Sequence, residues 1–253
     1  MFDLLAILGR GIQMVENNTS PSEISSWKLT EDLEVCDERS GHLPVRVPAD
    51  DDSPYCMVGG GSLNLQAGIN FMHQYLPKVL VFAYGDRSDY LKSVNGPTES
   101  EVMSKAFMHD IKQDPDISSW CLSRLPQQVI VIWPRTRIMS GPSNTGQELK
   151  NIFELAVERQ LERIAVVTIS VHVPRTATYV AKHLSVHEEW RHLRVTVFES
   201  EEVLLRANED RRPQIEALRN SKSFARSWER EAAGISKIVR DVYGDAKPMV
   251  TKI

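Results

Sequence analysis

The strongest chemical signal in the sequence is a polar turn that follows an apolar run, within residues 166–176. His172 and Arg175 lie in this turn, and Pro174 suits the first turn of a helix beginning there. A helix N-terminus disfavours cations because the peptide dipoles make it partly positive. We therefore expect an anion beside His172 and Arg175, either a ligand phosphate or carboxylate or an internal acid such as Glu99. A surface ion pair is the alternative, although such pairs contribute little to stability.

These residue types fit acid–base chemistry on an anionic ligand. Histidine titrates near neutrality, which suits His172 to general acid–base catalysis. Arg175 would hold an anion through a bidentate pair. Glu99 would orient His172 or act as a second base. Thr168 and Ser170, in the same segment, join the predicted ligand-binding set.

Further candidate ligand-binding residues lie directly after the other apolar runs. Ligands of open parallel sheets bind beyond the carboxyl ends of the strands, so residues at these positions are the ones to consider. Gly9, Arg10 and Gly11 follow the first run, where the glycines let the backbone approach a ligand and the arginine adds positive charge. A plain turn is an equally good interpretation, and the spacing does not match a dinucleotide fingerprint. Gly85 and Asp86 follow the second run.

The third run leads to three consecutive small hydrogen-bonding residues, Ser143, Asn144 and Thr145. All three types are preferred helix caps, so one of them is expected to cap the following helix. Three are more than one cap requires, and we expect at least one to contact a ligand. Earlier in the chain, Thr98 and Glu101 have the spacing of a capping box, which leaves Glu99 as the acid with a functional role.

The elements that must position these residues alternate between strand and helix. Uninterrupted apolar runs are typical of parallel strands buried on both faces. They span Leu4–Leu8, Val79–Ala83, Val129–Trp133, Ile164–Ile169 and Val195–Phe198. Amphipathic stretches separate them, at Leu63–Tyr75, Glu99–Ile111, Gly146–Gln160 and Thr176–Leu184. The alternation predicts an open, mainly parallel three-layer α/β fold.

Two regions interrupt this alternation, within what we interpret as a single domain over residues 1–253. Residues 16–57 form a polar insertion, too polar for a core, with a small hairpin around Leu33–Cys36 and Leu43–Val47. Because the insertion follows the first strand, we expect it to flank the site. Residues 201–243 form a helical C-terminal extension. Its apolar stripe comprises Ile215, Leu218, Phe224, Trp228, Ile235, Ile238 and Val242.

The composition and charge of the sequence disfavour several classes of protein. The 253 residues carry a net charge of −4, which disfavours a nucleic-acid partner. No apolar run reaches the roughly 18–20 residues of a membrane helix. Three cysteines form no CxxC pair, which predicts a reduced, cytoplasmic setting. The cluster of His183, His187 and His192 lacks a zinc signature, and we interpret it as solvated surface.

The order of these segments resembles the YdcF/SanA/ElyC-like proteins, the family known as domain of unknown function 218. Its Leu-Gly-Gly-like turn is matched by residues 8–11 and its Glu-Ala-x-x-Met helix start, loosely, by residues 99–103. Its Ser-x-Asn-Thr-x-Glu-Asn segment is partly matched by residues 143–148, with Gln147 at the position of the glutamate. Its Val-Thr-Ser-x-x-His-x-x-Arg-Ala motif is matched by residues 167–175, with the Thr, His and Arg spacing preserved.

The resemblance covers residues 3–12 and 78–184, and it implies a Rossmann-like fold binding a nucleotide-like ligand such as S-adenosylmethionine. The absence of an N-terminal anchor makes the chain more similar to the YdcF-type branch than to the anchored, envelope-linked relatives. The family implies no established reaction.

Together these observations predict a protein that binds a small anionic or nucleotide-like ligand at the strand ends and acts as a hydrolase or transferase. A non-catalytic binding or regulatory module, linked to cell-envelope processes, is the alternative. A metal-dependent phosphoesterase has weaker support, because it would need clustered carboxylates and only Asp86, Glu99 and Glu148 are candidates.

Overall fold

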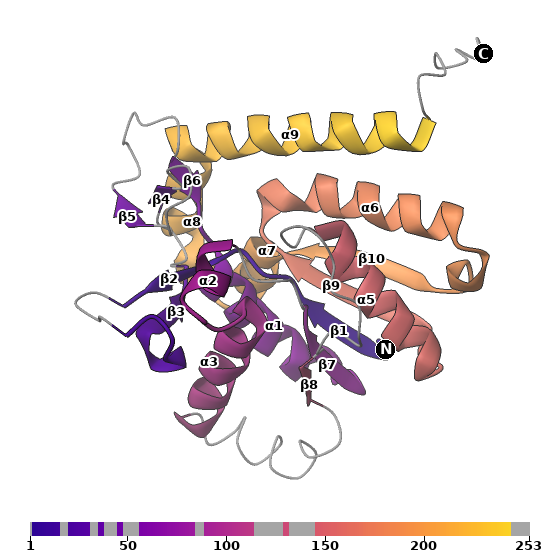
Figure 1. The fold of residues 1–253 in the computed structure, drawn as a ribbon, viewed down its shortest axis with the longest axis horizontal. Coiled ribbons are helices and arrows are strands. Elements are labelled where there is room, and N and C mark those ends of the chain that lie inside the picture. Colours follow the sequence, from indigo (N-terminus) through magenta and orange to yellow (C-terminus); the bar gives the residue numbers. More distant parts are fainter. Residues whose placement is uncertain are drawn as a thin grey trace.

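The computed structural model describes residues 2–15, 20–30, 35–37, 45–47, 56–83, 89–113, 129–131 and 145–243. Five strands form one parallel sheet in the order β10-β9-β1-β7-β8 (Figure 1). Their bounds are β1 Leu4–Ile7, β7 Val79–Phe82, β8 Val129–Val131, β9 Arg163–Thr168 and β10 Arg194–Glu199. The five predicted strands and their parallel pairing are confirmed.

The order in which the chain adds strands to the sheet changes direction at β1. The chain places β7 and then β8 on one side of β1, and afterwards β9 and β10 on the other. The carboxyl ends of β1 and β9 therefore meet where the strand order changes direction. In open α/β sheets, this is where the crevice for a ligand forms.

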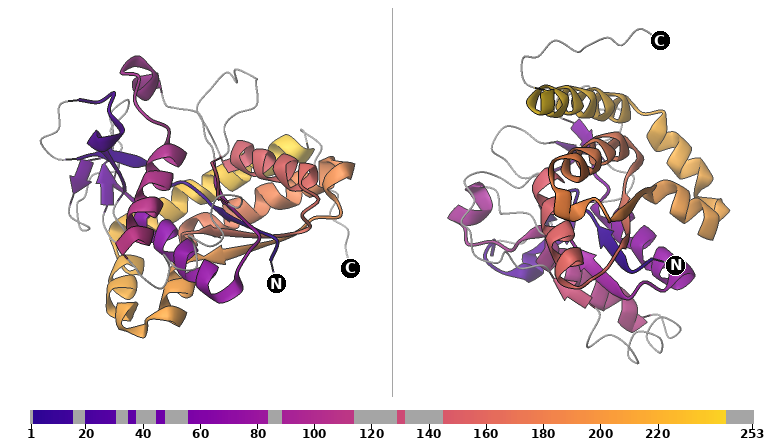
Figure 2. Two further views of the ribbon diagram at one scale, coloured as in Figure 1. Left: turned by 90° about the horizontal axis from the view of Figure 1, so that it is seen from below. Right: turned by 90° about the vertical axis from the view of Figure 1, so that its right-hand side faces the viewer.

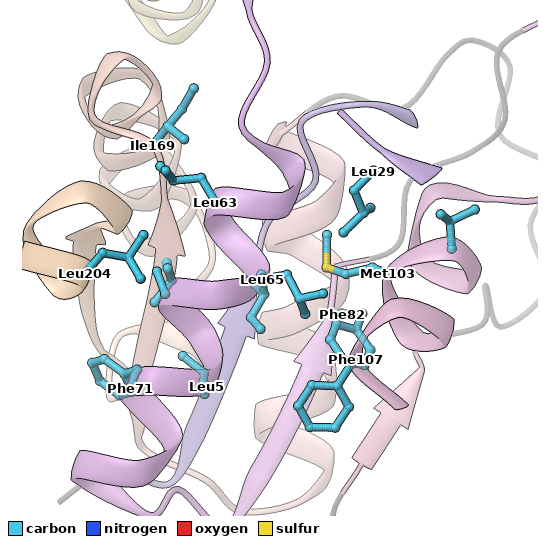
Figure 3. Packing of buried hydrophobic residues seen from close by; sticks show 14 of the residues in the cluster. Leu5, Leu29, Leu63, Leu65, Phe71, Phe82, Met103, Phe107, Ile169 and Leu204 are labelled. Carbon is cyan, nitrogen blue, oxygen red and sulfur yellow. The ribbon is translucent and has the colours of Figure 1, made fainter. Parts of the chain in front are cut away.

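Helices cover both faces of the sheet (Figure 2). They are α1 (Gly61–Tyr75), α3 (Glu99–Gln113), α5 (Thr145–Glu158) and α6 (Val173–Val186), while the short helix α2 (Asp89–Ser93) lies before α3 and away from the sheet (Figure 2). One apolar core joins alternate residues of the central strands to α1 and α3 (Figure 3). The other core joins the remaining residues of those strands to α5 and α6. Both faces of β1, β7 and β9 are thus buried, whereas β10 is a half-exposed edge strand, which its apolar run did not predict.

The predicted capping box starts α3. The Thr98 backbone N–H donates to the Glu101 carboxylate at 2.6 Å, and the Glu101 N–H donates to the Thr98 hydroxyl at 3.2 Å. The helix therefore begins where the sequence predicts it, with its first free N–H groups satisfied.

The insertion contributes to the core, which corrects the prediction that it is too polar to do so. Its strand β3 (Trp27–Leu29) pairs in antiparallel register with β2 (Ile12–Met14), which lies just before the insertion. Trp27 is only 3% exposed, and both it and Leu29 belong to the core under α1 and α3. Two apolar residues in a polar segment are enough to anchor it when the backbone pairs as a strand.

The predicted hairpin is also present. Strands β4 (Val35–Asp37) and β5 (Val45–Val47) pair antiparallel, and β6 (Cys56–Val58) pairs with the other edge of β4. The chain then returns to the sheet through α1, so the small sheet lies beside the carboxyl end of β1.

The C-terminal extension is helical, as expected. It comprises α7 (Ser200–Ala207), α8 (Arg212–Arg219) and α9 (Lys222–Tyr243). Helix α9 lies alongside α6 and also contacts β6 (Figure 1). The predicted apolar stripe is wrong at Trp228, which is 47% exposed, and confirmed at Ile238, which is buried. The buried face of α9 also includes Ser227 and Glu231, which the stripe did not contain. Among the described residues, no helix is both long and apolar enough to span a membrane.

Candidate functional site

His172 lies at the centre of a polar cluster at the carboxyl edge of the sheet. A 3₁₀ turn, Ser170–His172, follows β9 directly, and α6 begins at the next residue with Pro174 in its first turn. The predicted strand–turn–helix arrangement around His172 is therefore present. The side chain is buried, being 4% exposed.

Both ring nitrogens of His172 have side-chain partners. Nδ1 lies 3.1 Å from Oε1 of Glu231 in α9, and Nε2 lies 2.8 Å from Oγ1 of Thr145, the first residue of α5. Arg10 Nη1 also lies 3.4 Å from Nδ1, but the contact with Glu231 is shorter. Because a carboxylate only accepts hydrogen bonds, we assign the proton to Nδ1, which donates it to Glu231. In the neutral ring Nε2 then accepts, and the Thr145 hydroxyl donates to it. Hydroxyl, imidazole and carboxylate thus form a continuous chain.

Two arginines flank the Glu231 carboxylate. Arg10 Nη1 lies 3.4 Å from Oε1 of Glu231, and Arg175 Nη1 lies 3.5 Å from Oε2. Arg10 also donates to the Val58 carbonyl of β6 at 3.1 Å, which fixes its direction. The anion expected beside His172 and Arg175 is therefore supplied internally, by Glu231 rather than by Glu99. Both ion pairs are long, so neither arginine is saturated by this contact.

The surroundings set the protonation states of the central pair. Burial lowers the pKa of His172 and the positive charges of Arg10 and Arg175 act in the same direction, against the hydrogen bond to Glu231. Burial alone would raise the pKa of Glu231, but the hydrogen bond from His172 and the two arginines hold it at about 2. At neutral pH the pair is a neutral imidazole beside a carboxylate.

The Gly9–Gly11 turn holds the carboxylate of Glu99. The Gly11 backbone N–H donates to Oε1 of Glu99, at the start of α3. A Cβ on Gly9 would lie 2.4 Å from Cδ of Glu99, so only glycine allows this approach. The turn was expected to approach a ligand; the group it approaches in the structure is a side chain of the same chain.

Glu148 is a second buried acid at this edge. It is 8% exposed, and it lies one turn after Thr145 on the same face of α5. Within the described part of the chain its carboxyl group has no hydrogen bond or ion pair. Burial, with the charge of Glu99 in addition, raises its pKa to about 8, although Arg10 and Arg175 oppose the shift. Glu148 is therefore a protonated acid at neutral pH.

Several buried polar atoms at this edge lack a hydrogen-bond partner among the described residues. Buried polar side chains are normally paired, so a group of exceptions requires an explanation. They are Nε of Arg10, Oγ1 of Thr168, Nε of Arg175, Oγ1 of Thr176 and Oε2 of Glu231. Thr168 lies on the sheet face that packs against α5 and α6, and Thr176 is on the buried side of α6. Four of these five atoms are hydrogen-bond donors, which favours a partner rich in acceptor atoms.

A buried acid, Glu201, holds the turn that carries His172 in place. Glu201 of α7 accepts from the Ser170 backbone N–H at 2.8 Å and from its hydroxyl at 2.6 Å. Burial raises the pKa of Glu201, and these hydrogen bonds oppose the shift. Ser170, predicted to bind a ligand, thus uses its hydroxyl to hold the turn.

Only some of the site residues predicted from the sequence lie together in the structure. Arg10, Thr145, His172 and Arg175 meet through direct contacts or through Glu231. Gly85, Asp86, Ser143 and Asn144 lie outside the described residues, so their predicted roles stay predictions.

Glu231 was missed because it lies in the C-terminal extension, outside the recognisable motifs. A signal was present: Glu231 follows Ser227 by four residues and precedes Ile238 by seven, which places an acid on a buried helix face. The prediction that the histidine cluster is solvated surface holds at His192, which is exposed, and is wrong at His183. His183 is partly buried, donates to the Gly146 carbonyl at 2.8 Å, and packs against Trp190. In the described residues no group of three or more potential ligands is placed to hold a metal ion.

Comparison of the chain with protein-family models, with characterised proteins and with solved structures finds no match. The site must therefore be interpreted from its own chemistry.

Proposed function

We propose that this protein is a hydrolase or transferase that binds a small anionic or nucleotide-like ligand at the carboxyl edge of the sheet, with His172 as its general base. The observation that carries the proposal is the set of buried, unpaired donors around Arg10 and Arg175. An anion with several acceptor oxygens would satisfy them, and arginine suits such ligands through its planar donor groups.

The fold supports the location of the site. The strand order extends outward on both sides of β1, as in Rossmann-like domains, and we propose this classification for the chain. The cluster lies beside the ends of β1 and β9, where such domains bind nucleotides. The resemblance to YdcF-like proteins implies the same fold and a ligand such as S-adenosylmethionine. Of the residues that carry that motif, His172 lies at the centre of this cluster, and Thr168 and Arg175 border it.

The protonation states support a catalytic role over simple binding. A neutral imidazole with Nδ1 held by a carboxylate presents Nε2 as a base, which is the orientation that general-base catalysis requires. Glu148, kept protonated by its environment, provides an acid at the same edge. A pair of groups whose pKa values are pushed apart is typical of acid–base sites.

A thermal-shift panel tests the proposal. Nucleotides, S-adenosyl compounds, sugar phosphates and divalent metal ions would be screened against the full chain. A compound at about 100 times its dissociation constant should add about 2.7 kcal/mol to stability, a readily measured rise in Tm. Binding without turnover would favour the non-catalytic module, and no shift with any anionic compound would contradict the proposal.

A further inference from the structure

The Thr145–His172–Glu231 chain has the order of groups that activates a hydroxyl for attack. Thr145 Oγ1 lies 2.8 Å from His172 Nε2, and His172 Nδ1 lies 3.1 Å from Glu231 Oε1. Both distances are those of formed hydrogen bonds. A nucleophile, a base within hydrogen-bond reach and a third group orienting that base are the signature of nucleophilic catalysis.

We propose that Thr145 is a nucleophile that accepts a phosphoryl group from an anionic phosphate ester or anhydride. This inference rests on the proposed function and adds the reacting atom and the substrate class. Phosphoryl transfer fits better than acyl transfer because Arg10 and Arg175 flank the site, and cations stabilise the charge on a transferring phosphoryl group.

The step balances in atoms and electrons. Thr145 Oγ1 attacks phosphorus, forming a new phosphorus–oxygen bond while the bond to the leaving oxygen breaks. The hydroxyl proton moves to Nε2 of His172, which then delivers it to the leaving group. A water molecule, deprotonated by the same nitrogen, then attacks phosphorus. The bond between phosphorus and Thr145 Oγ1 breaks, phosphate is released, and His172 Nε2 returns the proton to Thr145 Oγ1. In a transferase, an acceptor hydroxyl takes the place of that water.

The position of Thr145 favours this chemistry. It is the first residue of α5, a helix of 14 residues, so the backbone N–H groups and the positive end of the helix lie beside its hydroxyl. Glu148, one turn later, is more than nine-tenths buried and without a hydrogen-bond partner in the described part of the chain. The start of the helix therefore supplies backbone donors beside Thr145, and Glu148 lies one turn further along the same helix.

Glu231 acts as a positioning residue in this scheme. Its carboxylate holds the Nδ1 proton and so keeps Nε2 directed at Thr145. Replacement by glutamine removes the charge that stabilises the imidazolium form. The pKa of His172 should then fall, and the acid limb of any His172-dependent rate should move to lower pH. A merely structural role would leave that pH profile in place.

A fluorophosphonate probe tests the inference without a known substrate, because its phosphorus–fluorine bond is broken by an activated hydroxyl. The full-length protein would be incubated with the probe and the labelled residue located by mass spectrometry. We expect an adduct on Thr145 and its retention in Thr145→Ser. Thr145→Val should lose it, and His172→Gln should label at least about 100-fold more slowly. Ser185→Ala, which removes an exposed hydroxyl near the end of α6, is the control and should label as the wild type does.

The outcomes separate this inference from the proposed function, which is measured by ligand-induced stabilisation. Absence of an adduct, an adduct on another residue, or labelling that is unchanged in His172→Gln would overturn the assignment of Thr145. If Thr145 forms an adduct with p-nitrophenyl acetate but not with the phosphorus probe, the phosphoryl substrate class is wrong. In either case, a stabilising anion from the panel would leave the binding site itself in place.

Discussion

Replacing Glu148 by glutamine should make the protein more stable, and increasingly so as the pH rises. The pKa of Glu148 is raised from its ordinary 4.5 to about 8 because the side chain is buried and near Glu99. Between these values the unfolded chain has lost the proton that the folded protein still holds. The unfolded state thus binds fewer protons, and the free energy of unfolding falls as pH rises. Glutamine has nearly the same shape as the protonated acid and does not titrate.

The size of the change in stability follows from the pKa shift of Glu148. At about 1.36 kcal/mol for each pH unit, the shift corresponds to a loss of about 5 kcal/mol across the whole interval, and of about 4 kcal/mol between pH 5 and pH 8. Urea unfolding of the wild type and Glu148→Gln at pH 5, 6.5 and 8 measures it directly. Glu154→Gln, at an exposed position of the same helix, is the matched control.

The predicted result is a stability difference that is small at pH 5 and grows with pH in Glu148→Gln, but not in Glu154→Gln. A difference that is constant with pH would refute the reasoning, since it would show that Glu148 is ionised in the folded protein throughout. A difference that grows towards low pH would have the wrong sign and refute it equally.

Two further substitutions test how the neighbouring acids are positioned. Gly9→Ala would place a Cβ against the carboxylate of Glu99, which must then move off the Gly11 N–H. Loss of that hydrogen bond should lower the free energy of unfolding by about 1–3 kcal/mol in urea titrations, and a wild-type value would show that the bond does not stabilise the turn. Thr98→Ala removes the hydroxyl that accepts from the Glu101 N–H at 3.2 Å, so it should cost about 1 kcal/mol by the same assay, whereas Thr98→Ser should cost less. No loss in Thr98→Ala would show that the capping box does not stabilise α3.

The sheet could be predicted from the sequence because each strand is a local pattern. An uninterrupted apolar run is typical of a strand with two buried faces, and the ends of such runs mark the edge where polar residues gather. That reasoning identified Arg10, His172 and Arg175 correctly as neighbours in space. It also identified Thr145, although it expected a cap or a ligand contact there and gave no partner for its hydroxyl.

The partner of His172 could not be predicted in the same way. Glu231 lies 59 residues further along the chain, and only the packing of α9 against the turn at Ser170–His172 brings it to the ring. The same holds for Trp27, whose burial depends on pairing with β2. Long-range packing of this kind leaves at most a weak trace in local periodicity, such as one acid on an otherwise buried helix face.

The central claim, that this edge binds an anionic ligand through its arginines, is tested most directly by calorimetry. The compound with the largest thermal shift would be titrated into the wild type and into Arg175→Ala, with Arg191→Ala, an exposed arginine beyond α6, as control. Loss of a charged hydrogen bond costs about 1.5–3 kcal/mol, so Kd should rise roughly 10- to 150-fold in Arg175→Ala and stay unchanged in Arg191→Ala. An unchanged Kd in Arg175→Ala, together with a large loss of stability, would show that Arg175 and Glu231 form only a structural ion pair and would contradict the account.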